Sequence, residues 1–443
     1  MSTMSITSLR EAYLNRSLEP QQLVESILER CEQYRDHNIW ISLLSLEQIG
    51  TYIHALSEKA IEDYPLWGIP FAIKDNIDLA GVKTTAACPS YAYIPEQSAF
   101  VVEQLIAAGA IPIGKTNLDQ FATGLVGTRS PYGACRNSIR PEMISGGSSS
   151  GSAVAVALGM VSFSLGTDTA GSGRIPAFLN NIVGVKPTVG SLSSSGMIPA
   201  CRSLDSMSIF TQNIDDAKQI FALSAIYDQY DDYARPHMAK TFSQTKLTIG
   251  VPEEHQLEWF GNEESPDLFK QTLAQLESAG ARLVSVDFSS FKKAADLLYS
   301  GPWVAERYAA MEKIFTETPD ILHPITKAIV EKAKNYSAVD TFKAMYQLQA
   351  YKKQADNVLT TVDCIVTPTA GTYYTIDEVE ADPIQLNTNL GYYTNFMNLL
   401  DYSALAVPFG AYDNAMPFGI TLFAEAGADY ELMSVANLLE NIK

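Results

Sequence analysis

Cysteine, histidine and basic side chains are scarce in this chain of 443 residues. The five cysteines are odd in number and form no Cys-x-x-Cys pair, which argues against a disulfide framework and against a structural zinc site. We therefore expect buried thiols in a reducing compartment. Only 31 Lys and Arg residues oppose 50 Asp and Glu residues, so the net charge is −19. A field of that sign repels nucleic acid and anionic membranes, and the sequence predicts neither as a partner.

Segments that would direct the chain out of the cytoplasm are also missing from the sequence. No basic segment followed by an apolar core stands at the N-terminus, so no signal peptide is expected. The longest apolar stretch, residues 153–165, is interrupted by Gly and Ser and is too short to span a bilayer. With 47% hydrophobic and 18% charged residues, the composition is typical of a well-buried globular enzyme. These features predict a cytoplasmic protein.

Two glycine-rich runs surround serines. Ser148 lies within residues 146–152 (GGSSSGS), and Ser172 lies within residues 166–174 (GTDTAGSGR). Glycines around a hydroxyl let a substrate approach the backbone and turn N–H groups inward, as an oxyanion pocket requires. A flexible linker is the alternative for residues 146–152, but the apolar segment 153–158 follows at once, which linkers do not usually show. The two runs therefore predict a serine nucleophile.

A serine nucleophile needs a base, and no histidine of this chain is an obvious candidate. All five histidines lie outside residues 66–205, which hold the glycine-rich runs: His37, His54, His237, His255 and His323. Lys74 instead ends the apolar run 68–73. Desolvation at that position favours the neutral amine, which a general base must be. Taken singly, Lys74 is a strand-end lysine that reaches solvent and Ser172 is a turn serine. Only the ordered trio of Lys74, Ser148 and Ser172 points to catalysis.

The order of apolar runs and glycine turns predicts an α/β fold, with a mixed β-sheet core layered by helices. The first 60 residues are expected to be helical, with Ser8 and Glu11 at capping-box spacing. Strands and helices then alternate. Strands are expected at 71–73, 111–113 and 161–165, and helices at 100–108 and 153–158.

With these three motifs in this order, the chain resembles the amidase signature family, hydrolases that use a Ser-Ser-Lys triad. The resemblance covers nearly the whole chain and is densest from 66 to 205. It implies that Lys74 is the base, Ser148 the bridging serine and Ser172 the nucleophile, and that the reaction uses no cofactor and no metal. It also implies the amidase-signature fold, in which an additional helical and α/β lobe accompanies the sheet.

The resemblance implies the following domain organisation. Residues 1–60 form an N-terminal helical region packed on the core, and residues 61–443 form the amidase domain. Within that domain the signature core covers about 66–215, a substrate-side lobe about 246–360, and a final core segment about 361–443. The lobe begins near Lys246, after an exposed connection at 224–245. Its expected elements are strands at 247–251 and 282–286, a helix at 265–279 and helices across 291–357, ahead of a strand at 364–366.

The implied reaction is amide hydrolysis through an acyl-enzyme. Neutral Lys74 takes a proton from Ser148, which takes one from Ser172, and the Ser172 alkoxide attacks the amide carbonyl and releases ammonia. In the family the peptide bond of Ser148 is cis. Backbone N–H groups are implied to hold the tetrahedral oxygen, namely those of Thr169, Ala170, Gly171 and Ser172. Arg174 is expected to brace this loop and not to bind substrate.

Three segments resemble the allophanate hydrolases within that family: residues 115–133, 199–205 and 299–308. In that subfamily a tyrosine and an arginine of the third segment hold the substrate, and they match Tyr299 and Arg307. An arginine fork suits a carboxylate, and a spacing of eight residues would put both side chains on one helix face. Gly124 would let the substrate approach the backbone. The implied substrate is a small anionic amide, allophanate (urea-1-carboxylate), which links the chain to urea carboxylase in urea degradation.

Alternatives remain for the activity. Within the family, the chain fits an amidase for another small carboxamide or a tRNA-dependent amidotransferase A-type subunit. The acidic charge and the 299–307 segment weigh against the latter. A catalytically silent scaffold is the non-enzymatic alternative, and the intact Lys74, Ser148 and Ser172 weigh against it. A homodimer is left open. Allophanate hydrolases usually carry a further C-terminal domain, and this chain ends at Lys443, about where the amidase portion should end.

One further motif competes with this assignment. Residues 109–116 (GAIPIGKT) match the P-loop pattern letter for letter, which would indicate a nucleotide-dependent enzyme. A P-loop follows a strand, whereas this segment follows the helix that is expected to end near Ala108. Pro112 also has no N–H to offer a phosphate. We therefore expect a helix-to-strand turn, with Lys115 near the end of the strand.

Overall fold

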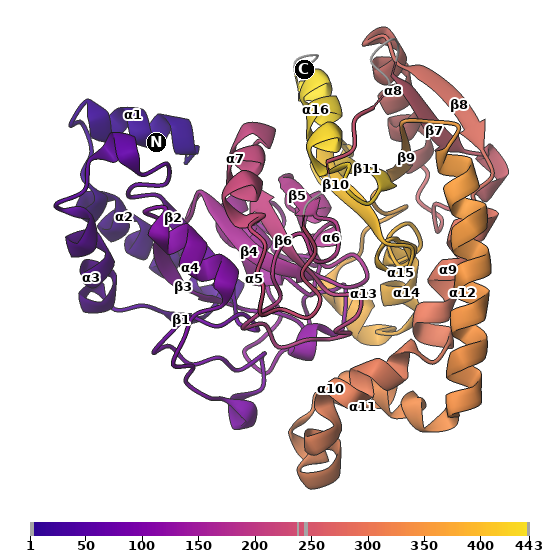
Figure 1. The fold of residues 1–443 in the computed structure, drawn as a ribbon, viewed down its shortest axis with the longest axis horizontal. Helices are drawn as coiled ribbons and strands as arrows, with labels where there is room; N and C mark the ends of the chain where they lie inside the picture. Colours follow the sequence, from indigo (N-terminus) through magenta and orange to yellow (C-terminus); the bar gives the residue numbers. More distant parts are fainter. Residues whose placement is uncertain (1–3, 237–238, 243–246, 441–443) are drawn as a thin grey trace.

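Eleven strands form one mixed β-sheet in the computed structural model, which describes residues 4–236, 239–242 and 247–440 (Figure 1). The strand order is β1-β3-β2-β4-β6-β5-β10-β11-β9-β7-β8. The strands are β1 (Trp40–Leu43), β2 (Pro70–Lys74), β3 (Ile111–Thr116), β4 (Phe163–Asp168), β5 (Val183–Lys186), β6 (Ser206–Thr211), β7 (Thr248–Pro252), β8 (Arg282–Val286), β9 (Cys364–Pro368), β10 (Tyr402–Ala411) and β11 (Pro417–Glu425). The predicted α/β class with a mixed sheet is confirmed.

Strands β2, β3 and β4 are parallel and buried along their whole length. Strands covered on both faces are continuous apolar runs, which is the pattern that predicted β2 and β3 in the sequence. The register pairs Ile73 with Leu165, and Lys74 with Thr116. Because parallel strands end at the same edge of a sheet, the end of β2 and the end of β4 bring their side chains together there.

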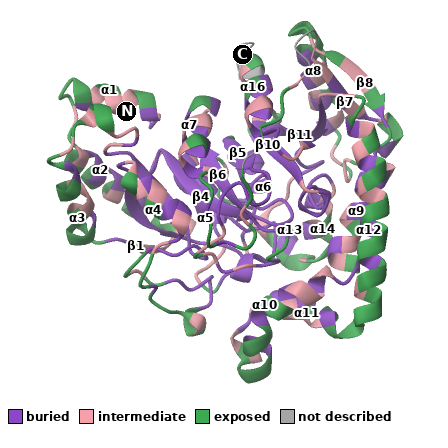
Figure 2. Ribbon diagram, viewed as in Figure 1, coloured by how far each residue is buried: buried purple, intermediate pink, exposed green. Residues whose placement is uncertain are grey.

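Helices pack against this sheet and around its ends. They are α1 (Ile6–Leu14), α2 (Pro20–Gln33), α3 (Leu46–Leu56), α4 (Phe100–Ala107), α5 (Ser150–Ala157), α6 (Ile175–Leu179), α7 (Ile214–Ser224), α8 (Ser265–Ser278), α9 (Ser289–Ser300), α10 (Trp303–Glu317), α11 (Pro324–Val330), α12 (Ala338–Leu359), α13 (Ile376–Ala381), α14 (Gln385–Leu390), α15 (Phe396–Leu399) and α16 (Asp429–Glu440). Helix α5 contacts β2, β3, β4 and β6. Figure 2 shows the central strands buried and many exposed residues along α12. Within the described residues, no helix combines the length and apolar character needed to cross a bilayer.

The region of residues 246–360 extends the same sheet. Strand β7 pairs in parallel with β8 on one side and with β9 on the other. Helices α9 and α12 pack against each other and lie at the opposite end of the molecule from α1–α3 in Figure 1. The strands expected at 282–286 and 364–366 and the helix expected at 265–279 are observed within two residues of those bounds. Lys246, the expected start of this region, lies outside the described residues.

Two expectations for the first 60 residues are wrong. Ser8 does not begin a helix, because Ser5 is the N-cap of α1 and its hydroxyl accepts a hydrogen bond from the Ser8 N–H. The region is also not purely helical, since β1 pairs with β3 in antiparallel orientation. This short strand is only half-buried, so its apolar pattern is weak and its pairing depends on a strand 70 residues away in sequence.

The P-loop match is a helix-to-strand turn, as expected. Residues 109–116 follow α4 and run into β3, so the loop that would hold a phosphate is extended strand. Lys115 is fully buried and its Nζ lies 3.2 Å from the Asp75 carboxylate. It is therefore held in an ion pair inside the protein. The five cysteines are free and buried, which confirms the expected buried thiols.

Candidate active site

Lys74 ends the central strand β2 and is fully buried. Its Nζ lies 2.8 Å from the Ser148 Oγ and 2.7 Å from the Thr167 Oγ1. Burial lowers the pKa of Lys74 to about 7, against the opposing effect of nearby carboxylates. A large share of this amine is therefore neutral near neutral pH, and it lies at proton-transfer distance from a serine hydroxyl.

Ser148 lies just before α5, in the glycine-rich run, and is fully buried. The Gly147–Ser148 peptide bond is cis. Glycine is required at 147, because a Cβ there would collide with the Asp119 carboxylate. The backbone carbonyl of Ser148 accepts a hydrogen bond from the Asp119 N–H at 3.1 Å. The run is thus a tightly packed loop, and not the flexible linker that was the alternative.

Ser172 follows β4 in the second glycine-rich run and is nearly fully buried. Its hydroxyl donates a long hydrogen bond of 3.4 Å to the Gly124 carbonyl. The backbone φ of Gly124 is +157°, and a Cβ there would lie 2.6 Å from the Asp119 carboxylate. The structure therefore joins two predicted site residues, Ser172 and Gly124, through a contact weak enough to be exchanged for a substrate.

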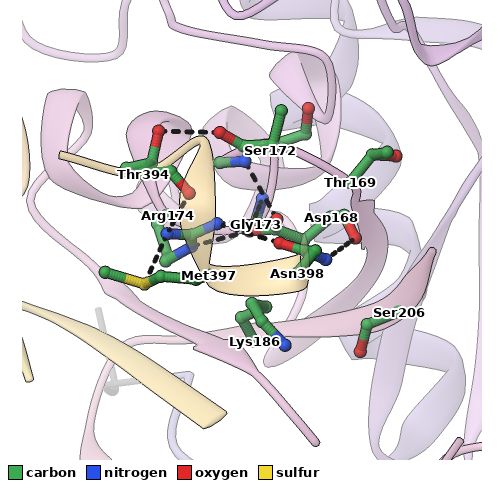
Figure 3. Close-up of polar contacts among 12 residues, drawn as sticks. Asp168, Thr169, Ser172, Gly173, Arg174, Lys186, Ser206, Thr394, Met397 and Asn398 are labelled. Carbon is green, nitrogen blue, oxygen red and sulfur yellow. Dashed lines mark hydrogen bonds and ion pairs between the residues drawn. The ribbon is translucent and has the colours of Figure 1, made fainter. Parts of the chain in front are cut away.

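The loop after β4 is held by a buried ion pair (Figure 3). The Arg174 Nη2 and Nε each donate to the Asp168 carboxylate at 2.9 Å. Arg174 also donates to the Thr394 carbonyl at 3.1 Å. Its expected role as a brace of the loop is confirmed. Asp168 also accepts the N–H groups of Gly171 and Gly173, both at 2.9 Å, so one carboxylate fixes the whole turn.

The oxyanion donors named from the sequence differ in availability. The Gly171 N–H is already bonded to Asp168. Within the described parts of the chain, the N–H groups of Thr169, Ala170 and Ser172 donate to no acceptor. In that part of the chain, these three N–H groups are the ones left unbonded for the oxyanion pocket that the resemblance implies. Asp205 supports the loop from the other side, because its carboxylate accepts from the Thr169 hydroxyl at 2.5 Å.

Tyr299 and Arg307 are in contact, although the expected geometry is wrong. They do not share a helix face, because α9 ends at Ser300 and α10 begins at Trp303, with Gly301 and Pro302 between them. The Arg307 Nη2 donates to the Tyr299 hydroxyl at 3.2 Å, and the guanidinium lies over the tyrosine ring at 5.3 Å from its centroid. The break between the helices folds the two side chains onto each other.

Arg307 is 1% exposed. Its Nη1 donates to the Thr123 hydroxyl at 3.2 Å, beside Gly124, while its Nε has no partner within the described ranges. Among the residues that the structure describes, its guanidinium forms no ion pair within 4 Å. A buried charge without an ion-pair partner is costly, so a carboxylate placed beside the Arg307 guanidinium would be stabilised there.

A cavity of about 270 Å³ opens beside Tyr299. Its wall contains three basic side chains, Arg129, Lys292 and Lys332, and one acidic side chain, Asp296. The volume lies just below the range of about 300 to 1,000 Å³ that is typical of small-molecule sites, and neither Ser172 nor Arg307 lines the cavity. In a chain with a net charge of −19, this local excess of positive charge favours an anion. No group of three or more metal-ligating side chains is found in the described part of the chain.

The sequence did not identify several residues of this site. Thr167 bonds Lys74, but that contact depends on the pairing of β2 with β4, which no local pattern reveals. Asp119 and Arg129 stand in a segment that carried the resemblance, yet nothing in their spacing indicates that one touches the catalytic loops and the other lines the cavity. Asp168 and Asp205 could have been found from the sequence, because Asp168 lies inside residues 166–174 and Asp205 inside residues 199–205.

The chain is similar to known proteins over most of its length. The family model described as Amidase matches residues 22–433. The urea amidolyase of Saccharomyces cerevisiae is 45% identical over 423 residues, which cover 94% of this chain and 23% of that protein. The chain spans less than a quarter of the length of the urea amidolyases it matches.

A solved structure, the allophanate hydrolase of Kluyveromyces lactis, has a TM-score of 0.93 and 41% identity to this chain. The match covers 99% of this chain and 72% of that one. The A-type subunit of the glutamyl-tRNA(Gln) amidotransferase of Chlorobium limicola is 30% identical over 477 residues, which cover 99% of this chain and all of that protein.

Proposed function

The chain belongs to the amidase family, and on that premise we propose that it hydrolyses a small anionic amide, allophanate, with a Ser-Ser-Lys triad. One observation carries the reaction type: a fully buried lysine whose pKa is about 7 lies 2.8 Å from a serine hydroxyl. The other buried strand-end lysines contact no catalytic serine: the Lys115 Nζ pairs with Asp75, and the Lys186 Nζ donates to the Pro187 carbonyl.

The proposed steps start from the contact of Lys74 with Ser148, and the transfer from Ser172 to Ser148 is the one that the family resemblance implies. Neutral Lys74 takes the proton of Ser148 as Ser148 takes that of Ser172, and the Ser172 Oγ bonds to the amide carbon. The oxygen that becomes negative is held by the free N–H groups of Thr169, Ala170 and Ser172. The proton returns to the leaving nitrogen, ammonia departs, and water then cleaves the acyl-enzyme by the same path.

The substrate is proposed from the Arg307 site. Allophanate carries one terminal amide and one carboxylate, and the buried Arg307 guanidinium lacks a carboxylate partner among the described residues. The similarity to urea amidolyases and to an allophanate hydrolase supports the same substrate, and with it a functional link to a urea-carboxylating enzyme. An amidase for a neutral carboxamide and an amidotransferase A-type subunit remain the competing proposals.

Ammonia release from a panel of amides tests this function. The panel holds allophanate, malonamate, biuret, propionamide and glutamine at equal concentrations. We expect the highest kcat/KM for allophanate, with malonamate, whose only charge is also a carboxylate, ahead of the neutral amides. A propionamide rate equal to the allophanate rate would overturn the substrate, and a preference for glutamine would favour the amidotransferase proposal.

The Arg307→Ala variant tests whether Arg307 binds the substrate carboxylate or only supports the fold. Loss of one partner of a desolvated charge pair costs about 2 to 5 kcal/mol, so kcat/KM for allophanate should fall well over tenfold, mainly through KM. The rate with propionamide should change little. Tyr299→Phe should cost about 1 kcal/mol, because it removes one hydrogen bond and keeps the ring.

Arg202→Ala is the matched control for this experiment. Arg202 is an exposed arginine, and its Nη2 lies 3.9 Å from the Asp232 carboxylate. Its kinetics should equal those of the unmodified protein. Equal losses for allophanate and propionamide in Arg307→Ala would show that Arg307 supports the fold, and the proposal would then retreat to an amidase of unspecified substrate.

A further inference from the structure

Asp119 is a fully buried carboxylate that the steps above do not use. It follows β3, and its Oδ2 accepts the N–H groups of Val126 and Gly127 at 3.2 and 3.0 Å. Its Oδ1 accepts the Arg129 N–H at 2.9 Å. Among the described residues it forms no ion pair within 4 Å. Three backbone N–H groups thus hold a negative charge that no cationic side chain neutralises directly.

The Asp119 carboxylate lies between two loops, one that holds Ser148 and one that contacts Ser172 through Gly124. Both Gly124 and Gly147 lack space for a Cβ because the Asp119 Oδ2 lies against them. The carbonyl of Gly124 is the acceptor of the Ser172 hydroxyl. The Asp119 N–H donates to the Ser148 carbonyl. One residue is therefore in contact with the loop of Ser148 and with the loop that meets Ser172.

The charge of Asp119 also acts on Lys74. The charged groups around Lys74 are the carboxylates of Asp119, Asp205 and Asp168 and the Arg307 guanidinium. After burial, which lowers the pKa of Lys74, Asp119 has the largest effect and raises it. Asp168 is already paired with Arg174.

Asp205 acts on Lys74 less strongly than Asp119 does, and burial raises its own pKa to about 6. The titratable and charged side chains that face Asp119, besides Lys74, are Arg129, His323 and Cys135. None of them is bonded to its carboxylate among the described residues.

We propose that Asp119 positions the triad and balances its charge: it holds the Ser148 and Gly124 loops together, and its carboxylate stabilises the ammonium that Lys74 becomes on taking the serine proton. The part of this proposal that concerns proton transfer depends on the amide hydrolysis proposed above. The role resembles that of the acid in a Ser-His-Asp triad, which stabilises the protonated base without taking the proton.

Asp119→Asn removes the charge and keeps the size of the side chain. Without the carboxylate the ammonium form of Lys74 is less stable, so its pKa should fall by about one unit or more. The acid limb of the plot of kcat/KM against pH should move to lower pH by the same amount. The value of kcat/KM on the plateau should fall about tenfold or more. Lys74 is followed by NMR of ¹³Cε-labelled lysine, which needs no substrate and therefore reports on Asp119 even if the proposed function fails.

Asp216→Asn is the matched control. Asp216 is a buried carboxylate that accepts the Ile6 N–H and is not among the charges around Lys74. It should leave the Lys74 pKa and the acid limb in place. Loss of activity in Asp119→Asn with an unshifted Lys74 pKa would overturn the proposal, because a purely structural residue gives that result.

A measurement on the unmodified protein covers the case in which Asp119→Asn does not fold. The ¹³Cγ resonance of Asp119, assigned through its own backbone, should shift as Lys74 is titrated, because a carboxylate that balances the ammonium senses its loss. An Asp119 resonance that does not respond while the Lys74 ¹³Cε resonance titrates would overturn the proposal directly.

Discussion

Ser172→Ala should abolish amide hydrolysis and leave the protein folded. The hydroxyl is the proposed attacking group, and the loss of a nucleophilic serine typically lowers kcat by about 10⁴-fold or more. Its contribution to the fold is small, because its hydroxyl contact is the 3.4 Å bond to the Gly124 carbonyl. We expect ammonia release below detection, with a thermal unfolding midpoint within a few degrees of that of the unmodified protein.

Ser206→Ala is the control for that experiment. Ser206 is also buried and lies in the same close-up (Figure 3), but its hydroxyl donates to the Pro187 carbonyl at 3.1 Å. Its turnover should stay within a few-fold of the unmodified rate. Turnover by Ser172→Ala close to the unmodified rate would remove Ser172 as the nucleophile, and Ser148, bonded to Lys74, would be the next serine to replace.

The sheet could be predicted where burial acts on both faces of a strand. The segments 71–73 and 111–113 are apolar because helices and strands enclose them, and they appear as β2 and β3. Strand β1 could not be recognised, since it is short and half-buried and its partner β3 is distant in sequence. Non-local pairing decides such a strand, whereas local composition decides a central one.

The residues of the site also fall into two groups, those that a local motif predicts and those that only the fold brings together. Lys74, Ser148 and Ser172 stand in short motifs whose residue types already indicate chemistry. The contact of Lys74 with Thr167 requires knowledge that β2 and β4 are neighbours. The Tyr299 and Arg307 pair was identified with the wrong geometry, because Gly301 and Pro302 end one helix and start another between them.

The pH dependence of the unmodified protein should follow Lys74. Burial lowers the pKa of this amine to about 7, and only the neutral form can accept a proton from Ser148. Below pH 7 the protonated fraction grows, so kcat/KM should fall about tenfold for each pH unit. Above about pH 8 the amine is neutral and the rate should reach a plateau. Lys74→Ala should lose most activity at every pH, because no base then remains beside Ser148.

Lys186 provides the control that separates this effect from that of any buried lysine. It is also fully buried, and burial lowers its pKa to about 8, but its Nζ donates to the Pro187 carbonyl and to neither catalytic serine. Lys186→Gln should therefore leave the acid limb near pH 7, whatever it does to stability. A flat pH profile, or an active Lys74→Ala protein, would point to a histidine base. His323 would then be tested first, because it is half-buried and Asp119 and Arg129 are among the charges that act on it.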